Sequence, residues 1–179
     1  QVQRGEHEVA VEMSRFTLHR LSEQYDGWSA VVADFNRDGA LDVASGPFVY
    51  LGPAFETRKQ YRVVSTFIAG TDYGGDMMDF AYHFTGDGWP DILSSDWDRK
   101  LGTRPMELYV NPRGESRRWN HTLVLPSITT ETVLMHDLDG DKRPEIVFGT
   151  AKSYAFARFD PANATTVWPV RDNSGRDLP

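Results

Sequence analysis

Short apolar runs alternate with clusters of aspartate, asparagine and glycine along most of the chain. The same order occurs three times, in VVADFNRDGALDVASG (31–46), FAYHFTGDGWPDILSS (80–95) and LMHDLDGDKRPEIVFG (134–149). In each segment an apolar run of strand length leads into a short Asp/Gly loop, and a second apolar run follows the loop. This pattern predicts two antiparallel strands joined by a tight loop. No segment shows the apolar spacing of an amphipathic helix, so the sequence predicts an all-β fold.

The repeat has a period of about fifty residues. If Asp38, Asp87 and Asp141 are equivalent, it recurs after 49 residues (38 to 87) and again after 54 residues (87 to 141). Such a period is typical of β-propellers, in which each blade is a sheet of four strands. Third strands are predicted at 48–50, 106–110 and 153–159, and fourth strands at 61–67, 119–125 and 165–170.

The predicted organisation is one partial β-propeller over residues 1–179, with blade units at about 28–67, 79–125 and 132–170. An additional strand at 15–22 would be the outer strand of a preceding blade. Known propellers close with about 4–8 blades, so three four-stranded blades form an incomplete ring. An open stack leaves apolar faces and strand edges uncovered. We therefore expect further chain or another subunit to supply the remaining blades.

Composition and charge exclude several classes of protein. The chain is 40% hydrophobic and 25% charged, which is typical of a folded globular domain. A net charge of −7, with no cluster of Lys and Arg longer than two residues, argues against nucleic acid as a partner. No apolar run approaches the roughly 18–20 residues of a membrane span. There is no cysteine, so disulfides and thiolate metal sites are excluded.

The first residue is Gln1 rather than Met, as in a processed secreted protein, so we expect an extracellular or periplasmic location. Asn120 and Asn163 lie in N-x-T sequons, which would carry glycan if a eukaryote secretes the protein.

The first loop, residues 34–42, has the oxygen pattern of a calcium site. Oxygen-bearing side chains occupy loop positions 1, 3, 5 and 9, namely Asp34, Asn36, Asp38 and Asp42. Calcium takes about 6–8 oxygen ligands, and the backbone carbonyl of Ala40 would add another. Gly39 allows the positive φ that such a tight turn requires. An EF-hand is excluded, because Ser45 stands at loop position 12 where an EF-hand needs Glu, and β-type sequence flanks the loop.

The other two loops meet this pattern in part. In the third loop, 137–145, the expected ligands are Asp137, Asp139, Asp141, the carbonyl of Arg143, and Glu145. Lys142 replaces the glycine there, so this turn is less easily formed. In the second loop, 83–91, His83 and Thr85 replace the first two acids and leave Asp87 and Asp91 as candidates. The alternative for all three loops is an Asp/Gly turn without an ion, because both residues favour turns.

The first loop meets the pattern D-x-[DN]-x-D-G-x-x-D in full and resembles the FG-GAP/VCBS-type repeat. Repeats of this type build integrin α-subunit propellers and occur in many secreted microbial proteins. The resemblance implies a propeller with calcium in its loops but no particular activity, because such repeats serve adhesion, binding and catalysis alike. The stretches 26–39 and 87–93 are also similar to the propellers of secreted aldos-2-ulose dehydratase-type and polysaccharide lyase-type proteins. The cupin-like sequence of the dehydratase type is not present.

Residues 72–98 combine seven aspartates with interleaved aromatic side chains and contain no Lys, Arg or Glu. Aromatic rings beside carboxylates suit sugar recognition, and paired carboxylates can act as acid and base on a glycoside. By alignment with the loop starts, Asp76, Asp79 and Glu131 would face a central channel, and they are the candidate catalytic or binding acids. The preferred alternative is that Asp87 and Asp91 belong to the second loop, while the aromatic side chains pack between blades.

The sequence therefore predicts a secreted, calcium-stabilised β-propeller module that binds carbohydrate or an extracellular protein. The alternative function is the propeller part of a carbohydrate-active lyase or dehydratase.

Overall fold

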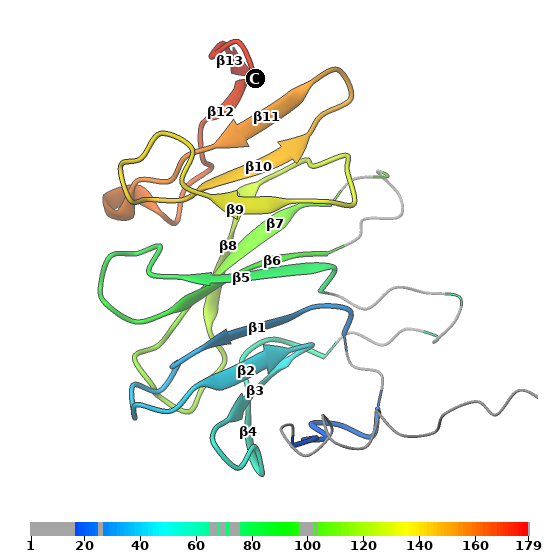
Figure 1. The fold of residues 1–179 in the computed structure, drawn as a ribbon, viewed down its shortest axis with the longest axis vertical. Coiled ribbons are helices and arrows are strands. Elements are labelled where there is room, and N and C mark those ends of the chain that lie inside the picture. Colours follow the sequence, from blue (N-terminus) through cyan, green and yellow to red (C-terminus); the bar gives the residue numbers. More distant parts are fainter. Residues whose placement is uncertain are drawn as a thin grey trace, which may run out of the picture.

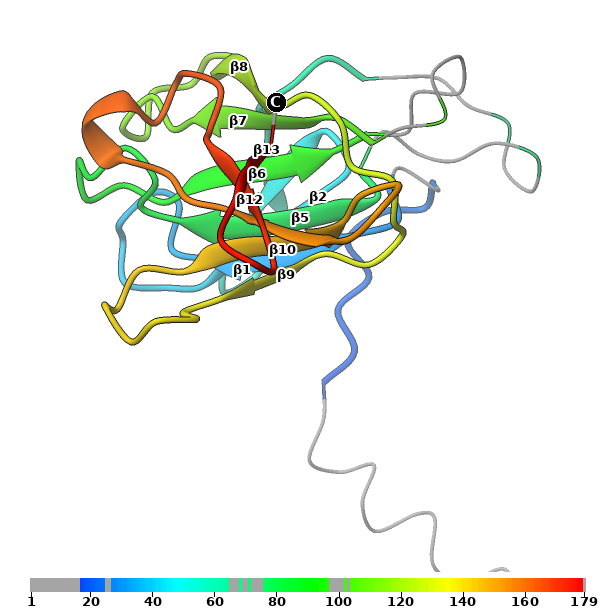
Figure 2. The same cartoon turned by 90° about the horizontal axis from the view of Figure 1, so that it is seen from above.

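The computed structural model describes residues 17–24, 27–64, 68, 71, 76–96, 102 and 104–178. The described chain is all-β, as predicted, and its strands form three antiparallel sheets. The sheets lie one above the other (Figure 1), and the first strand of each lies on the same side of the stack (Figure 2). None of the described residues forms a helix long and apolar enough to cross a membrane.

Each sheet is a meander in which sequential strands are neighbours. The first sheet consists of β1 (Ala30–Ala33), β2 (Asp42–Ser45), β3 (Phe48–Leu51) and β4 (Thr57–Gln60). The second sheet consists of β5 (Met78–Tyr82), β6 (Asp91–Ser95), β7 (Met106–Val110) and β8 (Asn120–Leu125). The third sheet consists of β9 (Leu134–His136), β10 (Glu145–Gly149), β11 (Tyr154–Ala157), β12 (Val170–Asp172) and β13 (Asp177–Leu178), with a 3₁₀ turn, η2 (Pro161–Asn163), after β11.

The strand pairs on either side of the three Asp/Gly loops form as predicted, whereas two of the outer strands do not. The fourth strand of the first sheet is the polar segment Thr57–Gln60 rather than 61–67. Residues 61–64 leave the sheet because Tyr61 is fully buried between the first two sheets, and 65–67 lie outside the described residues. In the third sheet the fourth strand begins only at Val170, and β13 adds a fifth.

The additional strand predicted at 15–22 does not form over its described part. Residues 17–22 carry no strand, and 15 and 16 lie outside the described residues. Most of residues 17–24 are exposed, so this segment lacks the burial that would hold it in a sheet.

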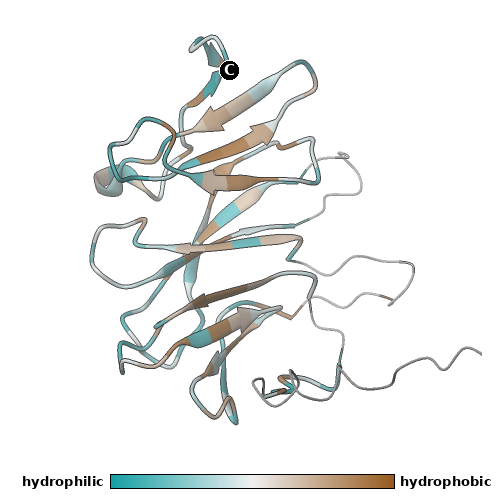
Figure 3. Ribbon diagram, in the orientation of Figure 1, coloured by the Kyte–Doolittle hydropathy of each residue, from teal (hydrophilic) through white to brown (hydrophobic). Residues whose placement is uncertain are grey.

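Alternation of side chains along the strands gives each sheet two faces and decides how the sheets stack. One face of the first sheet packs against the second sheet through a buried cluster of Phe35, Ala44, Val49, Tyr61, Ile92, Tyr109 and Trp119. The opposite face of the second sheet packs against the third through a larger cluster that includes Phe84, Leu93, Leu108, Ile146, Phe148 and Trp168. Hydrophobic residues accordingly follow the strands, while the hairpin loops are largely hydrophilic (Figure 3).

At both interfaces between neighbouring sheets, a tryptophan near the outer strands donates a backbone hydrogen bond to the preceding sheet. The backbone N–H of Trp119 donates to the carbonyl of Tyr61 at 2.8 Å, which links the second sheet to the first. The backbone N–H of Trp168 donates to the carbonyl of Val124 at 2.9 Å, which links the third sheet to the second. Both indole rings are buried. The packing between neighbouring sheets is therefore repeated as well as the sheets themselves.

Candidate metal loops and a buried acidic pair

The three Asp/Gly loops share one backbone conformation. Positions 4 and 6 of each loop have positive φ: Arg37 (58°) and Gly39 (91°), Gly86 (71°) and Gly88 (83°), Gly140 (81°) and Lys142 (70°). Residues with a Cβ rarely adopt this conformation, so its recurrence at the same two positions is a specific feature. The predicted positive φ at Gly39 is confirmed, and Lys142 adopts it despite its side chain. The second loop keeps the conformation although it has lost the first two acids.

In the first and third loops the acidic side chains turn inward onto the backbone of their own loop. Asp34 accepts hydrogen bonds from the N–H groups of Asp38 (3.1 Å) and Gly39 (2.9 Å). Asp137 likewise accepts from the N–H of Lys142 at 2.9 Å. The position 5 carboxylates, Asp38 and Asp141, each accept from the N–H two residues further on, at 2.8 Å. These contacts turn the carboxylates of both loops toward their own backbone.

The acid at position 9 is buried in every loop and ties the loop to the end of the third strand. One oxygen of Asp42 accepts from the N–H of Phe35 in the loop and the other from the N–H of Gly52 after β3, both at 2.9 Å. Asp91 does the same with the N–H groups of Thr85 (3.0 Å) and Asn111 (2.9 Å). Burial raises the pKa of both carboxyls, against the opposing effect of these N–H donors.

Glu145 is the third member of this set, with one difference. It accepts from the N–H of Leu138 in the loop at 2.8 Å, but its other oxygen accepts from Nε of the Arg158 side chain at 2.8 Å. The position 9 acids thus have a structural role in all three sheets. They hold the hairpin loop against the third strand whether or not an ion binds.

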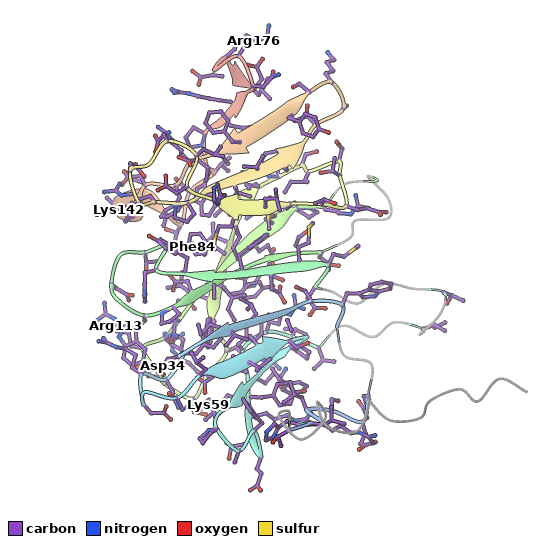
Figure 4. All side chains as sticks on the ribbon, viewed as in Figure 1. Asp34, Lys59, Phe84, Arg113, Lys142 and Arg176 are labelled. Carbon is purple, nitrogen blue, oxygen red and sulfur yellow. The ribbon has the colours of Figure 1, made fainter. Side chains whose placement is uncertain are left out.

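The oxygens of the third loop lie within reach of a single cation. Asp137, Asp139 and Glu145 each offer a carboxylate oxygen within 4.8 Å of the others. An all-oxygen set of this kind suits a hard cation such as calcium. The first loop offers Asp34, Asn36, Asp38 and Asp42, but among the described residues its three carboxylates do not form such a close group. The first and third loops lie along the same edge of the stack, where Asp34 and Lys142 are labelled in Figure 4. The donors in both loops fit calcium.

The second loop uses its two acids for contacts within the protein. Asp87 accepts from the N–H of Trp89 at 2.9 Å and forms an ion pair with Nε of Arg113 at 3.3 Å. Asp91 accepts an additional hydrogen bond from the hydroxyl of Thr85 at 2.9 Å. His83 is exposed. The metal ligands predicted in this loop remain a prediction with less support than those of the other two.

The predicted channel acids Asp76 and Asp79 are buried between the first two sheets, at the end opposite the loops. Asp76 accepts hydrogen bonds from the N–H groups of Trp28 (3.0 Å) and Gly46 (2.7 Å) and lies 3.8 Å from a guanidinium nitrogen of Arg62. Neither carboxylate oxygen of Asp79 has a hydrogen-bond partner among the described residues. Burial, reinforced by the nearby charge of Asp76, raises the pKa of Asp79 to about 7.

Glu131 does not join this pair. Its side chain is 78% exposed and forms an ion pair with Arg104 at 3.2 Å. Among the described residues, no hydrogen bond or ion pair connects Glu131 with Asp76 or Asp79. Other members of the acidic stretch, at 72–75 and 97–98, lie outside the described residues. Glu131 and the buried pair thus have different surroundings, and a shared acidic site remains a prediction.

Two arginines that the loop pattern does not include, Arg62 and Arg158, contact the acids of these sites. Arg62 donates to the carbonyl of Gly46 (3.1 Å) and to the hydroxyl of Ser94 (3.1 Å), which places a cation beside the buried acids. Its signal is an arginine inside the apolar stretch YRVV at 61–64. Arg158 follows the third strand of the third sheet, where the other two sheets have Gly52 and Asn111. Its signal is a charged residue near the end of the predicted third strand.

Comparison of the chain with protein families, with curated proteins and with solved structures found no match.

Proposed function

We propose that this chain is a calcium-stabilised repeat module of β-propeller type. The observation that carries the proposal is the common backbone of the three loops, with positive φ at positions 4 and 6 in each. The stacked four-stranded meanders, with their first strands on one side, support a propeller-type arrangement. An extracellular or periplasmic location would suit the module, because extracellular calcium modules bind with dissociation constants of about 10⁻⁴–10⁻³ M.

In the first loop, Asp34, Asn36, Asp38 and Asp42 would hold the ion with their side-chain oxygens, and Ala40 with its carbonyl. In the third loop, Asp137, Asp139, Asp141 and Glu145 would do so, with the carbonyl of Arg143. A bound calcium ion neutralises the carboxylates that the loop brings together. Since the loop joins the two inner strands of a sheet, the ion would add to the stability of the hairpin.

Thermal unfolding with chelator and with added calcium tests this assignment. Saturation at about 100 times the dissociation constant adds about 2.7 kcal/mol if only the native state binds. We expect chelator to lower the melting temperature and Asp38→Ala to remove most of the response. Asp160→Ala is the matched control, because Asp160 is also exposed and accepts a backbone hydrogen bond, from Ala162 at 3.1 Å, but lies outside the loops. A melting curve indifferent to chelator and calcium would refute the metal assignment.

We further propose that the partner of the module is another sheet of the same repeat, from further chain or from another subunit. The support is a row of three side-by-side residues, one from each of the first three strands, that occurs at the equivalent place in all three sheets. Val31–Ala44–Val49 and Phe80–Leu93–Leu108 face the next sheet, and Leu134–Val147–Phe156 is the corresponding row of the third sheet. Leu93 and Leu108 are fully buried, whereas Leu134 is 58% exposed. The third sheet thus presents the same apolar face without a described partner.

A carbohydrate ligand and the enzymatic alternative have less support. Asp76 is engaged with the backbone of the first sheet, and Glu131 is exposed beside Arg104. Acid–base catalysis on a glycoside needs two carboxyls on opposite sides of one bond. Two of the three candidate acids are thus already engaged in contacts within the protein, which is why this alternative has less support.

A further inference from the structure

Arg158 lies over the carboxylates that would bind calcium in the third loop. Its Nε donates to Glu145 at 2.8 Å, and one of its terminal nitrogens contacts Asp139. Asp139 and Glu145 are two of the three residues whose oxygens cluster within 4.8 Å. A planar guanidinium can bond two carboxylates at once, and such charge-assisted bonds are the stronger class of hydrogen bond. The third loop therefore already has a cation, supplied by the chain itself.

The first loop differs from the third in this respect. The residue that follows its third strand is Gly52, which donates only a backbone N–H to Asp42. The guanidinium carbon of Arg37, the arginine within this loop, lies over the Trp89 ring, 5.3 Å from the ring centroid. Among the described residues, no lysine or arginine forms an ion pair with an acid of the first loop. The loop that meets the calcium pattern in full is thus the one without an internal cation.

The second loop lies between these two cases. Its Asp87 forms one ion pair, with Arg113, whose side chain is 70% exposed. Arg158 makes two contacts rather than one and reaches the buried Glu145. It also directly follows strand β11 of the same sheet, whereas Arg113 lies in a turn. These differences make Arg158 the stronger competitor for a metal ion.

We infer that Arg158 is an intramolecular competitor of calcium, which neutralises the third loop when no ion is bound and must leave Asp139 and Glu145 before one binds. This inference rests on the proposed calcium binding and adds its regulation. A guanidinium and a calcium ion bound to the same carboxylates would lie a few ångströms apart and repel each other, because both are cations. Since the Arg158 side chain is 46% exposed, displacement can return it to solvent. The third loop should consequently bind calcium more weakly than the first and keep its shape when calcium is absent.

Isothermal titration of the full chain with calcium chloride tests the inference, using wild type and Arg158→Gln. Glutamine keeps much of the side chain and removes the charge. We expect wild type to show one tighter and one weaker site, and Arg158→Gln to tighten the weaker site about tenfold or more, as for the loss of a charge-assisted hydrogen bond. Arg171→Gln is the matched control, because Arg171 is in the same sheet, is similarly exposed and pairs with Asp177 at 2.8 Å. It should leave both sites unchanged.

Arg158→Lys provides a second variant that keeps the charge and loses the two-pronged contact, so it should tighten the weaker site less than Arg158→Gln. Melting in chelator adds a second readout: Arg158→Gln should melt below wild type and regain more on calcium addition. If calcium binds but Arg158→Gln changes neither affinity nor the calcium response, the competition is refuted while calcium binding stands. If no variant binds calcium, the proposed function itself fails.

Discussion

The carboxylate of Asp76, just ahead of β5, accepts a hydrogen bond from the backbone N–H of Gly46 at the end of β2, at 2.7 Å. The contact joins the second sheet to the first. The same carboxylate accepts from the N–H of Trp28, and a Cβ added at Gly27 would lie 2.2 Å from one of its oxygens. Backbone and carboxylate are thus fitted closely together, and Asp76 acts as a structural acceptor.

Asp76→Asn should therefore destabilise the fold. An amide keeps the shape, but turns a donor toward one of two buried N–H groups. We expect a loss of about 2–4 kcal/mol in the free energy of unfolding, measured by urea denaturation. Glu131→Gln is the control, since Glu131 is exposed, and it should change stability by no more than about 0.5 kcal/mol. Equal effects of the two substitutions would contradict the assignment of Asp76 as a tie between sheets.

Asp79 should make the protein less stable as the pH rises toward neutrality. Its pKa in the folded protein is about 7, against an ordinary value of 3.8, so the folded state holds the proton more tightly than the unfolded state. Stability is then greatest below about pH 4 with respect to this group and falls until about pH 7. Asp79→Asn cannot ionise and should flatten that slope, with a higher urea midpoint than wild type at pH 8. The comparison is the change in urea midpoint between pH 5 and pH 7. If the wild-type midpoint falls no more steeply than that of Asp79→Asn, Asp79 is not protonated in the folded protein over this range.

Lys142 and Gly39 occupy the same loop position with positive φ, so opposite substitutions should have opposite effects. Lys142→Gly removes the steric cost of a Cβ and should stabilise the protein by about 0.5–1 kcal/mol. Gly39→Ala should destabilise it by about 1–2 kcal/mol. A Cβ at Gly39 would meet nothing within 4 Å, so that cost is conformational rather than a clash. Both variants should be measured in chelator, to separate backbone strain from ion binding; a stabilising Gly39→Ala would disprove the explanation.

Leu108 and Leu134 lie on the equivalent face of successive sheets, but Leu108 is buried by the next sheet and Leu134 is exposed. Leu108→Ala should cost about 2–5 kcal/mol, because it leaves a cavity between the second and third sheets. Leu134→Ala should cost no more than about 0.5 kcal/mol, because Leu134 is 58% exposed. Urea unfolding at low protein concentration measures both, and sedimentation at high concentration shows whether the wild-type face draws copies together. A large cost for Leu134→Ala in a monomer would mean that the face is already covered.

The outer strands show where local sequence was a poor guide. An apolar run at 61–67 predicts a strand, yet the strand that forms is the polar Thr57–Gln60. An outermost strand needs backbone partners more than apolar side chains, and β3 supplies those partners over its whole length. Tyr61 contributes more to stability in the interface between the sheets, where it contacts the rings of Tyr109 and Trp119. Whether the segment at 61–64 joins the edge of the first sheet or packs between two sheets therefore depends on contacts with residues far away in the sequence, such as Tyr109 and Trp119.

The sequence alone determined the three strand–loop–strand units and the positive φ at Gly39. Both depend on residues close together in the chain, namely alternating apolar side chains and the Asp and Gly residues of each turn. Only the tertiary structure decided the roles of the charged groups. Asp76 meets Gly46 across 30 residues, and Arg158 meets Asp139 across 19. Whether a carboxylate binds an ion, accepts from a backbone N–H or pairs with an arginine depends on which groups the stacked sheets bring to it. Its neighbours in sequence do not contain that information.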